Sequence, residues 1–461
     1  MTDGAPATRQ AFTPPFPAEL PASLAFIRML ARGDGDLLSL MPARIYRMKS
    51  GTLGLSRRST VLFNDPADVR EILEDREGVF PKSDLMVNAL EPLIGQSVFT
   101  TDGEKWRRQR AMIDPAFSHM RLSVAFAAMQ SAVDDYIVTL RARADAGEAF
   151  SLDEAMSHLT ADIICRTVFS VSLESGIAQD VFEDFAVFER DVAQVKFLRL
   201  VFDPAWKKVP QPDHVLAACA RIRRHLGSLI DTHLHAAPGT YDDIASAVIA
   251  SRDSETGAAF TRDELIDQLG VFFLAGHKTT ASALTWLFFI LATRPALLSR
   301  LRDELDGAGE IGTNALKALP FARALFRETL RLYPPITFMP RVALRDAVIG
   351  GRKVRRGAIV MISPWTLHRH YRLWREPHHF DPDRFMPGRE GELVPGALIP
   401  FGAGPHICIG AGFAQMESAL IIAALGRSFD FEVAGADEVR PVAHLTTSPA
   451  RQITVRVRHR R

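Results

Sequence analysis

An apolar-rich run in the second half of the chain predicts one long helix over residues 261–293. Thr261 and Glu264 have the spacing of a capping box, which satisfies the first backbone donors of a helix. A helix of this length spans roughly 45–50 Å. It is apolar on almost every side, so we expect it to be buried in protein or in a membrane. The charged Lys278 lies near its middle, where a lysine costs about 2.5–3.5 kcal/mol in a bilayer. The sequence therefore favours a buried central helix.

The rest of the chain is mostly helical in its spacing, with short strand-like runs. Helices are expected over residues 65–77, 101–110, 119–146, 151–172, 178–200, 213–236, 321–332 and 411–425. Short strands are expected at residues 44–55 and 59–63. Short strands and turns are expected at residues 340–341, 348–351 and 358–362, and the tail to residue 461 is strand-like. Residues 81–100 show no sustained period and predict a loop with room for one short helix.

Nothing in the composition divides the chain into parts. Residues 1–22 are polar and punctuated by prolines, which indicates an extended lead-in. No repeat or linker follows, so we expect one domain over residues 23–461. Hydrophobic residues make up 47% of the chain, enough for a large core. The 55 Lys and Arg against 54 Asp and Glu give no sign of a nucleic-acid partner.

The three cysteines are too few and too scattered for a disulfide scaffold or a zinc cluster. They are Cys165, Cys219 and Cys408. This usage favours a reducing compartment, so a cytoplasmic location is expected. The apolar patch over residues 24–30 is interrupted by Arg28 and is too short to span a membrane. We therefore expect no membrane anchor.

One cysteine lies in a loop that suits a metal-binding thiolate. Cys408 sits in the segment Phe401-Gly402-Ala403-Gly404-Pro405-His406-Ile407-Cys408-Ile409-Gly410, just before an expected helix. Glycines let backbone amides turn toward one point, and a helix N-terminus adds partial positive charge, so both favour the thiolate. Taken alone, a single cysteine is more often a small buried apolar residue. A phosphate-binding glycine loop is excluded, because its sixth position is Ile407 and no strand–helix–strand unit surrounds it.

The spacing Phe401-x-x-Gly404-x-His406-x-Cys408-x-Gly410 resembles the haem-binding loop of the cytochromes P450, the haem-thiolate monooxygenases. Three other motifs of that family occur in the family's order, and with the loop they span residues 101–410. They are Trp106 with Arg110, the segment 275–280, and Glu328 and Arg331 with Arg384. The chain is identified on these motifs as a cytochrome P450 of the soluble bacterial type. The resemblance implies a mainly α fold with a small β-rich lobe and a long central helix over the haem.

The resemblance also implies one bound haem b, with the Cys408 thiolate as its iron ligand. An axial thiolate pushes electron density to the iron and favours O–O cleavage. The residues expected to hold the cofactor are Trp106, Arg110, Arg341, Phe401, Gly402, His406 and Gly410. An arginine suits a haem propionate because its planar fork of donors matches a carboxylate.

Taken alone, the segment around Trp106 is a solvated basic helix face, and Lys105, Arg107 and Arg108 could form a basic patch for an acidic electron donor.

The middle of the central helix carries the residues expected to handle oxygen. They are Ala275, Gly276, Lys278 and Thr279. The two small residues let a flat ligand lie against the helix, and the Thr279 hydroxyl can bond back to the helix or hold a water. In the family, this threonine helps to protonate oxygen, and the residue before it is usually an acid of the proton relay. Lys278 departs from that pattern. Either the lysine swings out to a salt bridge, or the relay runs differently.

Glu328, Arg331 and Arg384 are expected to form a buried structural triad that braces the loop of Cys408. By itself Glu-x-x-Arg means little, because such pairs stabilise ordinary helices. One carboxylate between two guanidinium groups is well satisfied by bidentate bonds. A nearby group of histidines fits no standard metal site, so we interpret most of them as surface or hydrogen-bonded side chains. They are His368, His370, His378 and His379.

The implied reaction inserts one oxygen atom from O₂, the co-substrate, into a hydrophobic small molecule such as a terpenoid, steroid, fatty acid or aromatic. Substrate contacts are expected at Phe272, Ile336, Phe338 and Leu445, although a buried Phe is most often plain core packing. The sequence has no flavin or iron–sulfur segment, so electrons are expected from a separate ferredoxin, or flavodoxin, and its reductase. A monomer is expected. Two other classes stay open: a haem-thiolate enzyme that uses peroxide or needs no redox partner, and a non-catalytic haem-binding protein.

Overall fold

The computed structural model describes residues 12–21, 23–24, 27–28, 36, 38, 41–53, 59–192, 208–237, 239–309, 311–313 and 318–460. Much of the expected lead-in, the end of the expected strand over 44–55 and the end of the expected helix over 178–200 lie outside the described residues. The division into a lead-in and one domain over 23–461 stays a prediction.

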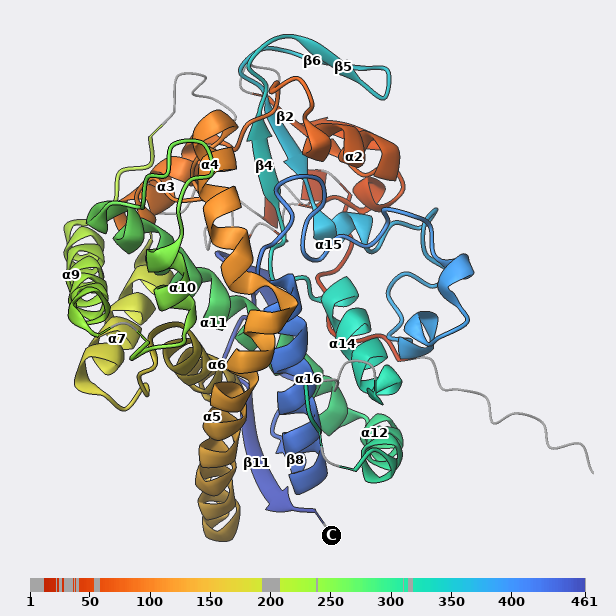
Figure 1. Cartoon of the computed structure of the whole chain (residues 1–461). Coiled ribbons are helices and arrows are strands. Elements are labelled where there is room, and N and C mark those ends of the chain that lie inside the picture. The colour runs from red at the N-terminus through yellow and green to blue at the C-terminus, as the bar shows by residue number, and fades with distance from the viewer. Residues whose placement is uncertain are drawn as a thin grey trace, which may run out of the picture.

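The mainly α architecture with a small β-rich lobe is confirmed, and helices surround a long central helix (Figure 1). The described helices are α2 (Pro66–Glu74), α3 (Asp84–Ile94), α4 (Gly103–Ile113), α5 (His119–Ala146), α6 (Leu152–Phe169), α7 (Gly176–Asp191), α9 (Asp213–His235), α10 (Ile244–Ala250), α11 (Arg262–Thr293), α12 (Pro295–Gly307), α14 (Pro320–Leu332), α15 (Pro364–Leu367) and α16 (Ala411–Ser428). Every helix expected from the sequence therefore forms where the structure describes it, and α3 is the short helix within residues 81–100.

The described strands build small sheets that join distant parts of the chain. One sheet has the order β1 (Ser50–Leu53), β2 (Thr60–Phe63), β7 (Ile359–Ile362) and β4 (Met339–Val342), and another has β3 (Ala149–Ser151), β11 (Thr454–His459) and β8 (Phe429–Val433). The hairpins are β5 (Ala347–Ile349) with β6 (Arg352–Val354) and β9 (Pro441–Ala443) with β10 (Thr447–Pro449). β2 and β7 run parallel, with Thr60 opposite Ile359.

The strand expected over residues 44–55 is wrong in its first half. Residues Ala43–Tyr46 form a 3₁₀ helix, and β1 begins only at Ser50. The side chain of Asn64 donates a hydrogen bond to the Ile45 carbonyl (2.9 Å), the acceptor that a neighbouring strand would use. The buried Tyr46 hydroxyl accepts a hydrogen bond from the indole N–H of Trp365 at 3.0 Å. These tertiary contacts outweigh the local strand preference.

The central helix α11 has the predicted start and the predicted burial. The Thr261 hydroxyl accepts a hydrogen bond from the Glu264 N–H (3.2 Å), and the Glu264 carboxylate accepts one from the Thr261 N–H (2.8 Å), so the capping box is confirmed. Between residues 268 and 291 every residue is buried except four. These four are Ala275, Gly276, Lys278 and Thr279.

Within the described residues, no helix taken singly has the length and apolar composition of a membrane span. α11 and α12 meet that condition only when counted together, and the chain bends by 107° between them.

Candidate active site

The loop before α16 has the geometry that its glycines predict. Gly402 and Gly404 have φ angles of +78° and +70°, and a Cβ atom on Gly404 would lie 2.5 Å from the carbonyl oxygen of Leu73. Only glycine fits that position without strain. The Cys408 N–H donates to the Phe401 carbonyl (2.9 Å), which folds the loop back on itself.

The Cys408 thiol is free and exposed, whereas Cys165 and Cys219 are buried. Protein atoms nevertheless surround the sulfur, and burial raises the pKa of the Cys408 thiol, although the Gly410 N–H and the Arg110 guanidinium act to lower it. The loop donor thus favours the thiolate as expected, but burial has the larger effect on the pKa. Cys408 is exposed even though protein atoms surround its sulfur, so the sulfur stays open to a ligand. A metal cation bound there would remove the proton.

Basic side chains gather beside this loop. Burial lowers the pKa of Lys82 to about 8 and also lowers the pKa of Arg341. Burial lowers the pKa of His406 to about 3, and the positive charges of Lys82, Arg341 and Arg110 act in the same direction. Asp102 is the acid beside them, 3.9 Å from Lys82 Nζ and 3.8 Å from His406 Nε2. One carboxylate does not neutralise this cluster, so it fits the two propionates of a haem.

Trp106 and Arg110 lie one turn apart on α4 and reach the same loop. The Trp106 and His406 ring centroids are 3.9 Å apart. Arg110 donates from Nη1 to the Ile407 carbonyl (2.7 Å) and from Nε to Asp114 (2.6 Å). The Nδ1 of His406 is buried and, among the described residues, has no hydrogen-bond partner. The structure thus brings these sequence-predicted residues together directly before the cysteine.

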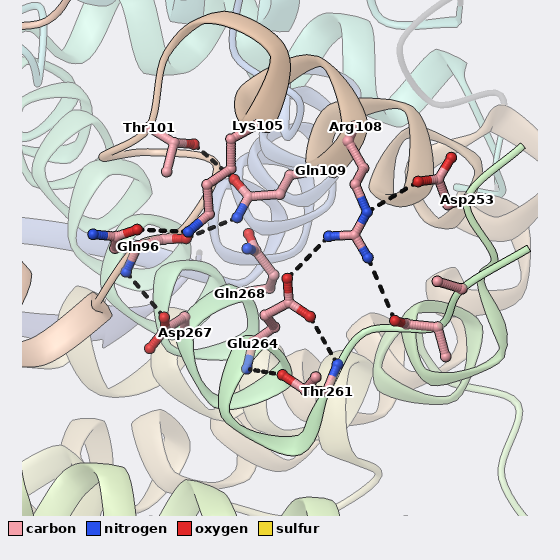
Figure 2. A network of polar contacts seen from close by, with 12 residues as sticks. Gln96, Thr101, Lys105, Arg108, Gln109, Asp253, Thr261, Glu264, Asp267 and Gln268 are labelled. Atoms are coloured by element: carbon pink, nitrogen blue, oxygen red, sulfur yellow. Dashed lines mark hydrogen bonds and ion pairs between the residues drawn. The ribbon is translucent and has the colours of Figure 1, made fainter. Parts of the chain in front are cut away.

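A polar network fixes another face of α4 to the N-terminal part of α11 (Figure 2). Arg108 bonds Glu264 (2.9 Å), the second member of the capping box, and Asp253 (3.1 Å). The buried Gln109 donates to the Gln96 carbonyl (2.7 Å). These bonds hold α4 in the orientation that turns its tryptophan toward the cysteine loop.

Arg108 is therefore not available for the basic patch expected on α4. Its guanidinium is bonded within the protein, and Lys105 donates to the Gln96 side chain (2.5 Å). Arg107 is exposed. The expected patch is wrong for Arg108.

A partly exposed strip on α11 contains Ala275, Gly276 and Thr279. The Thr279 hydroxyl donates to the Ala275 carbonyl (2.7 Å), so it bonds back to its own helix and keeps its oxygen free to accept. A Cβ atom on Gly276 would collide with Ile164 of α6. Packing between α11 and α6 therefore explains why residue 276 is a glycine. The other two residues of the strip, Ala275 and Thr279, are the ones left open beside it.

The Lys278 side chain points toward α7. Its ammonium lies 2.9 Å from the Glu189 carboxylate of α7, and the two side chains are 19% and 21% exposed. Of the two alternatives for this lysine, the salt bridge is confirmed. The adjacent His277 packs against Phe185 of α7, with ring centroids 4.7 Å apart, and its Nδ1 lies 2.8 Å from the Phe273 carbonyl. Burial lowers the pKa of His277 to about 4, so the ring is neutral.

Glu328, Arg331 and Arg384 come together as expected, but unequally. Arg331 Nε and Nη2 each lie 2.7 Å from a Glu328 oxygen, and both side chains are completely buried. The Asp381 N–H donates to the same carboxylate (2.7 Å). Arg384 Nε is farther away, at 3.5 Å. The triad is a tight pair with a looser third member.

The pair reaches the cysteine loop through His368. Arg331 donates from Nη1 to the His368 carbonyl (2.9 Å), and the His368 Nε2 accepts from the Ile399 N–H (2.9 Å), shortly before Phe401. His368 is completely buried, and burial lowers its pKa to about 3, which keeps the ring neutral so that it can accept. The hydrogen-bonded interpretation of this histidine is confirmed, and the bracing path is visible bond by bond.

The expected substrate residues lie on three segments. They are Phe272 on α11, Ile336 and Phe338 after α14, and Leu445 before β10. Thr447 fastens these segments to one another: its carbonyl accepts from Ser282 (2.6 Å) and Trp286 (3.0 Å) of α11, and its N–H donates to Pro335 (3.0 Å). Phe272 is only 5% exposed, with its ring edge-on to Phe117 at 5.0 Å, so it packs in the core.

Three residues of this site were not among the sequence candidates: Lys82, Asp102, and His368 as a link in the brace. None lies in a motif, and each acquires its place through contacts with segments distant in the sequence. The sequence carried no signal for Lys82, because its burial is visible only in the structure.

Comparison with known proteins agrees with this geometry. The Cytochrome P450 family profile matches residues 46–456. Cyclooctatin synthase of Streptomyces melanosporofaciens is 29% identical over 97% of this chain and 96% of its own. Cyclooctat-9-en-7-ol 5-monooxygenase of the same organism is 30% identical over 87% of this chain and 83% of its own. The crystal structure of the cytochrome P450DA heme domain is 23% identical and superimposes with a TM-score of 0.77 over 90% of both chains.

The chain belongs to the cytochrome P450 family. It is a cytochrome P450 monooxygenase, with a haem-iron cofactor and O₂ as its co-substrate.

Proposed function

We propose that this cytochrome P450 hydroxylates a hydrophobic small molecule, most specifically a terpenoid, with electrons from a separate ferredoxin, or flavodoxin, and its reductase. The observation that carries the proposal is the free Cys408 thiol beside a cluster of buried basic groups, which together suit the iron and the propionates of one haem. Haem b is proposed because the sequence has no Cys-x-x-Cys-His segment for covalent attachment.

The proposed reaction is balanced as follows. The substrate R–H, O₂, two electrons and two protons give R–OH and one water, so one C–H bond breaks and one C–O bond forms. When bound, the haem supplies the iron at which O₂ is held and reduced. The chain's own residues divide the remaining tasks. Cys408 ligates the metal, Arg110, Arg341 and His406 hold the propionates with Lys82, and Thr279 presents a hydroxyl oxygen on the open strip of α11.

The substrate class is proposed from the lining and from the relatives. Ile336, Phe338 and Leu445 are partly exposed apolar residues on segments that Thr447 ties to α11. Apolar walls of this kind exclude water and favour an apolar substrate. The relative cyclooctat-9-en-7-ol 5-monooxygenase and the pentalenene oxygenase of Streptomyces avermitilis, 28% identical over 85% of this chain and 86% of its own, have terpenoid names. Terpenoids are therefore the first class to test, before steroids, fatty acids and aromatics.

We also propose that the protein works as a monomer in the cytoplasm, without a membrane anchor. The three scattered cysteines support the reducing compartment. Size-exclusion chromatography with light scattering tests the monomer: a mass of 51.0 kDa is expected, and twice that mass would refute it.

The experiment begins with the absorption spectrum of the reduced protein with carbon monoxide. We expect the long-wavelength Soret band of a thiolate-ligated haem, lost in Cys408→Ala and kept in the matched control Cys219→Ala. Cyclic terpene hydrocarbons and alcohols are then titrated for a spin-state shift, with fatty acids and steroids as comparison compounds. Turnover with ferredoxin, reductase, NADPH and heavy-isotope O₂ should place one labelled oxygen in the product. A shift with fatty acids alone would contradict the terpenoid proposal, and a wild-type spectrum without the thiolate band would contradict the whole assignment.

A second candidate function is favoured by Lys278, because the family's usual acid is absent there. A haem-thiolate enzyme that uses hydrogen peroxide, or needs no redox partner, has no need of a relay from solvent. Turnover with peroxide that equals or exceeds turnover with the ferredoxin system would establish it. Turnover with O₂ and ferredoxin alone would dismiss it. A non-catalytic haem-binding protein would show neither turnover nor a spectral shift with any hydrophobic compound.

A further inference from the structure

Thr447, at the start of β10, directs all of its polar groups at other segments of the chain. Its hydroxyl donates to the Pro334 carbonyl (2.6 Å), and its N–H donates to the Pro335 carbonyl (3.0 Å). Its carbonyl accepts two bonds from α11, one from the Ser282 hydroxyl (2.6 Å) and one from the Trp286 indole N–H (3.0 Å). Thr447 is completely buried, so it forms no part of an exposed wall itself.

A further bond joins Thr447 to Thr337. The two hydroxyl oxygens lie 2.8 Å apart. Because the single hydroxyl proton of Thr447 is already donated to Pro334, Thr337 is the donor in this bond. Both threonines are buried, so loss of the Thr447 hydroxyl leaves the Thr337 donor unpaired in the interior, which is costly.

The bond between the two threonines sets the gap between two apolar walls. Thr337 is buried, whereas its neighbours Ile336 and Phe338, which form the first wall, are partly exposed. This alternation is that of an extended chain, so the bond that holds Thr337 inward turns Ile336 and Phe338 the opposite way. The second wall is Leu445, a partly exposed residue two positions before Thr447.

The carbonyl of Thr447 ties both walls to the oxygen-handling part of α11. Ser282 lies one turn beyond Thr279 on that helix, and residues three apart are neighbours on a helix surface. Trp286 also stacks on Tyr333, at the end of α14, with ring centroids 4.1 Å apart. Neither the stack nor the carbonyl bonds involve the Thr447 hydroxyl, so the segments stay attached when the hydroxyl alone is removed.

We propose that Thr447 is a specificity-determining positioning residue, whose hydroxyl fixes the gap between the two walls and thereby decides which carbon of the substrate faces the open strip of α11. The inference rests on the proposed monooxygenase function and deepens it. The position of hydroxylation is then selected by a hydrogen bond that the substrate does not touch.

The first test measures binding and needs no turnover. The ferric holoenzyme is titrated with 1-phenylimidazole and 4-phenylimidazole, which bind haem iron through the imidazole nitrogen and direct their phenyl rings differently. Thr447→Val removes the hydroxyl and keeps the shape of the side chain. The ratio of the two dissociation constants should shift by on the order of tenfold, the factor that corresponds to one buried hydrogen bond. An unchanged ratio would overturn the proposal.

The matched control is Thr446→Val. Thr446 is adjacent, of the same residue type and also buried, but its hydroxyl lies 3.1 Å from the Ser448 hydroxyl in the same part of the chain. This variant should keep the wild-type ratio, and so should Thr447→Ser, which retains the hydroxyl. An equal shift in Thr446→Val would reveal a general effect of the hairpin and would refute the assignment to Thr447.

A second variant removes the other end of the same bond. Thr337→Val leaves no donor unpaired, so it provides the test even if Thr447→Val does not bind haem. Its ratio should shift in the same direction, and the double variant should differ little from the single ones because the bond can be lost only once. A wild-type ratio in Thr337→Val, or fully additive effects, would contradict the proposal.

The product distribution supplies a readout that a merely structural role would not move. The terpene with the largest spin-state shift in the wild type is oxidised with the ferredoxin system, and the products are separated by gas chromatography with mass detection. In Thr447→Val the ratio of the main product to its regioisomers should fall by on the order of tenfold, while the thiolate band is kept. A purely structural loss would lower the amount of holoenzyme and leave that ratio unchanged, and this result would overturn the proposal.

The two levels of inference fail in different ways. A wild-type protein without the thiolate band contradicts the proposed function. A normal thiolate band and normal wild-type turnover, together with unchanged binding and product ratios in Thr447→Val, contradict only the role of Thr447.

Discussion

Glu328 on α14 and Glu417 on α16 are both completely buried, yet the protein surrounds them in opposite ways. Glu328 receives two bonds from Arg331 and one from the Asp381 N–H, each at 2.7 Å. Neither oxygen of Glu417 meets the hydrogen-bond geometry with a described residue, and the Thr280 side chain is the polar neighbour that acts on its charge. Burial alone therefore does not decide whether a carboxyl group carries charge, because the partners decide it. The paired group is fixed and braces the cysteine loop, whereas burial favours the protonated form of the unpaired one.

The largest effect is expected from Glu328→Gln. The substitution leaves the Arg331 charge buried without its partner, so the free energy of unfolding should fall by about 3–5 kcal/mol. Urea denaturation followed by circular dichroism measures it. The control is Glu417→Gln, the same chemical change at the unpaired site, and equal losses in the two variants would remove the contrast between them.

The next effect separates the two arginines around Glu328. Arg331 also donates to the carbonyls of His368 and Pro377 (2.9 and 2.6 Å), whereas Arg384 lies 3.5 Å from the carboxylate. Arg331→Met leaves a buried charge and several carbonyls unpaired, so it should destabilise the protein by about 2 kcal/mol more than Arg384→Met does. The same denaturation experiment tests this. A larger loss in Arg384→Met would show that the third member of the triad is the stronger one.

A pH-dependent effect is expected at Glu417. The unfolded chain releases this proton near the ordinary pKa of about 4.3, but the folded protein keeps it, so the folded state binds one more proton. The free energy of unfolding therefore falls as pH rises, and Glu417→Gln removes that contribution. Relative to the wild type, the variant should gain about 1.4 kcal/mol per pH unit above pH 4.3, until the folded-state pKa is reached. Urea denaturation of both proteins between about pH 5 and 8 measures the difference. A constant difference would mean that Glu417 is ionised in the fold.

The smallest effect is expected at the pair of Lys278 and Glu189. Both side chains are about one-fifth exposed, at 19% and 21%, so water screens their attraction. A double-mutant cycle with Lys278→Met and Glu189→Gln should give a coupling energy of about 0.2–1 kcal/mol that declines with added salt. A coupling of several kcal/mol would make this pair comparable to the buried one and would weaken the contrast.

Much of this molecule was accessible from local sequence patterns. The capping box of Thr261 and Glu264 and the glycine-rich loop of Cys408 are written in consecutive residues, and both form as predicted. The helix positions followed from hydrophobic spacing for the same reason. The salt bridge of Lys278 was one of two alternatives predicted from the sequence. Its partner on α7, Glu189, could be identified only from the packing of the helices.

The remainder depended on contacts between distant segments. Lys82 joins the basic cluster only because the chain before α3 lies beside Arg341 and His406. No spacing in the sequence predicts this contact. Glu417 lies in a helix, where a glutamate is ordinarily a solvated position, and only the packing around α16 shows that it is buried. The expected strand over residues 44–55 was half wrong because the Asn64 side chain takes the Ile45 carbonyl.

The pairing of β2 with β7 has a consequence for how the chain is made. In this pairing Thr60 lies opposite Ile359. β3 likewise pairs with a strand from much later in the chain, β11, with Phe150 opposite Val455. On the ribosome, the N-terminal strands emerge long before their partners are synthesised, and the cysteine loop follows later still than β7. Pairings between segments so far apart form slowly and leave strand edges open in the meantime. The nascent protein must therefore be kept from aggregating until β7 and β11 have been synthesised, and the cysteine loop between them can hold haem only once it has been made.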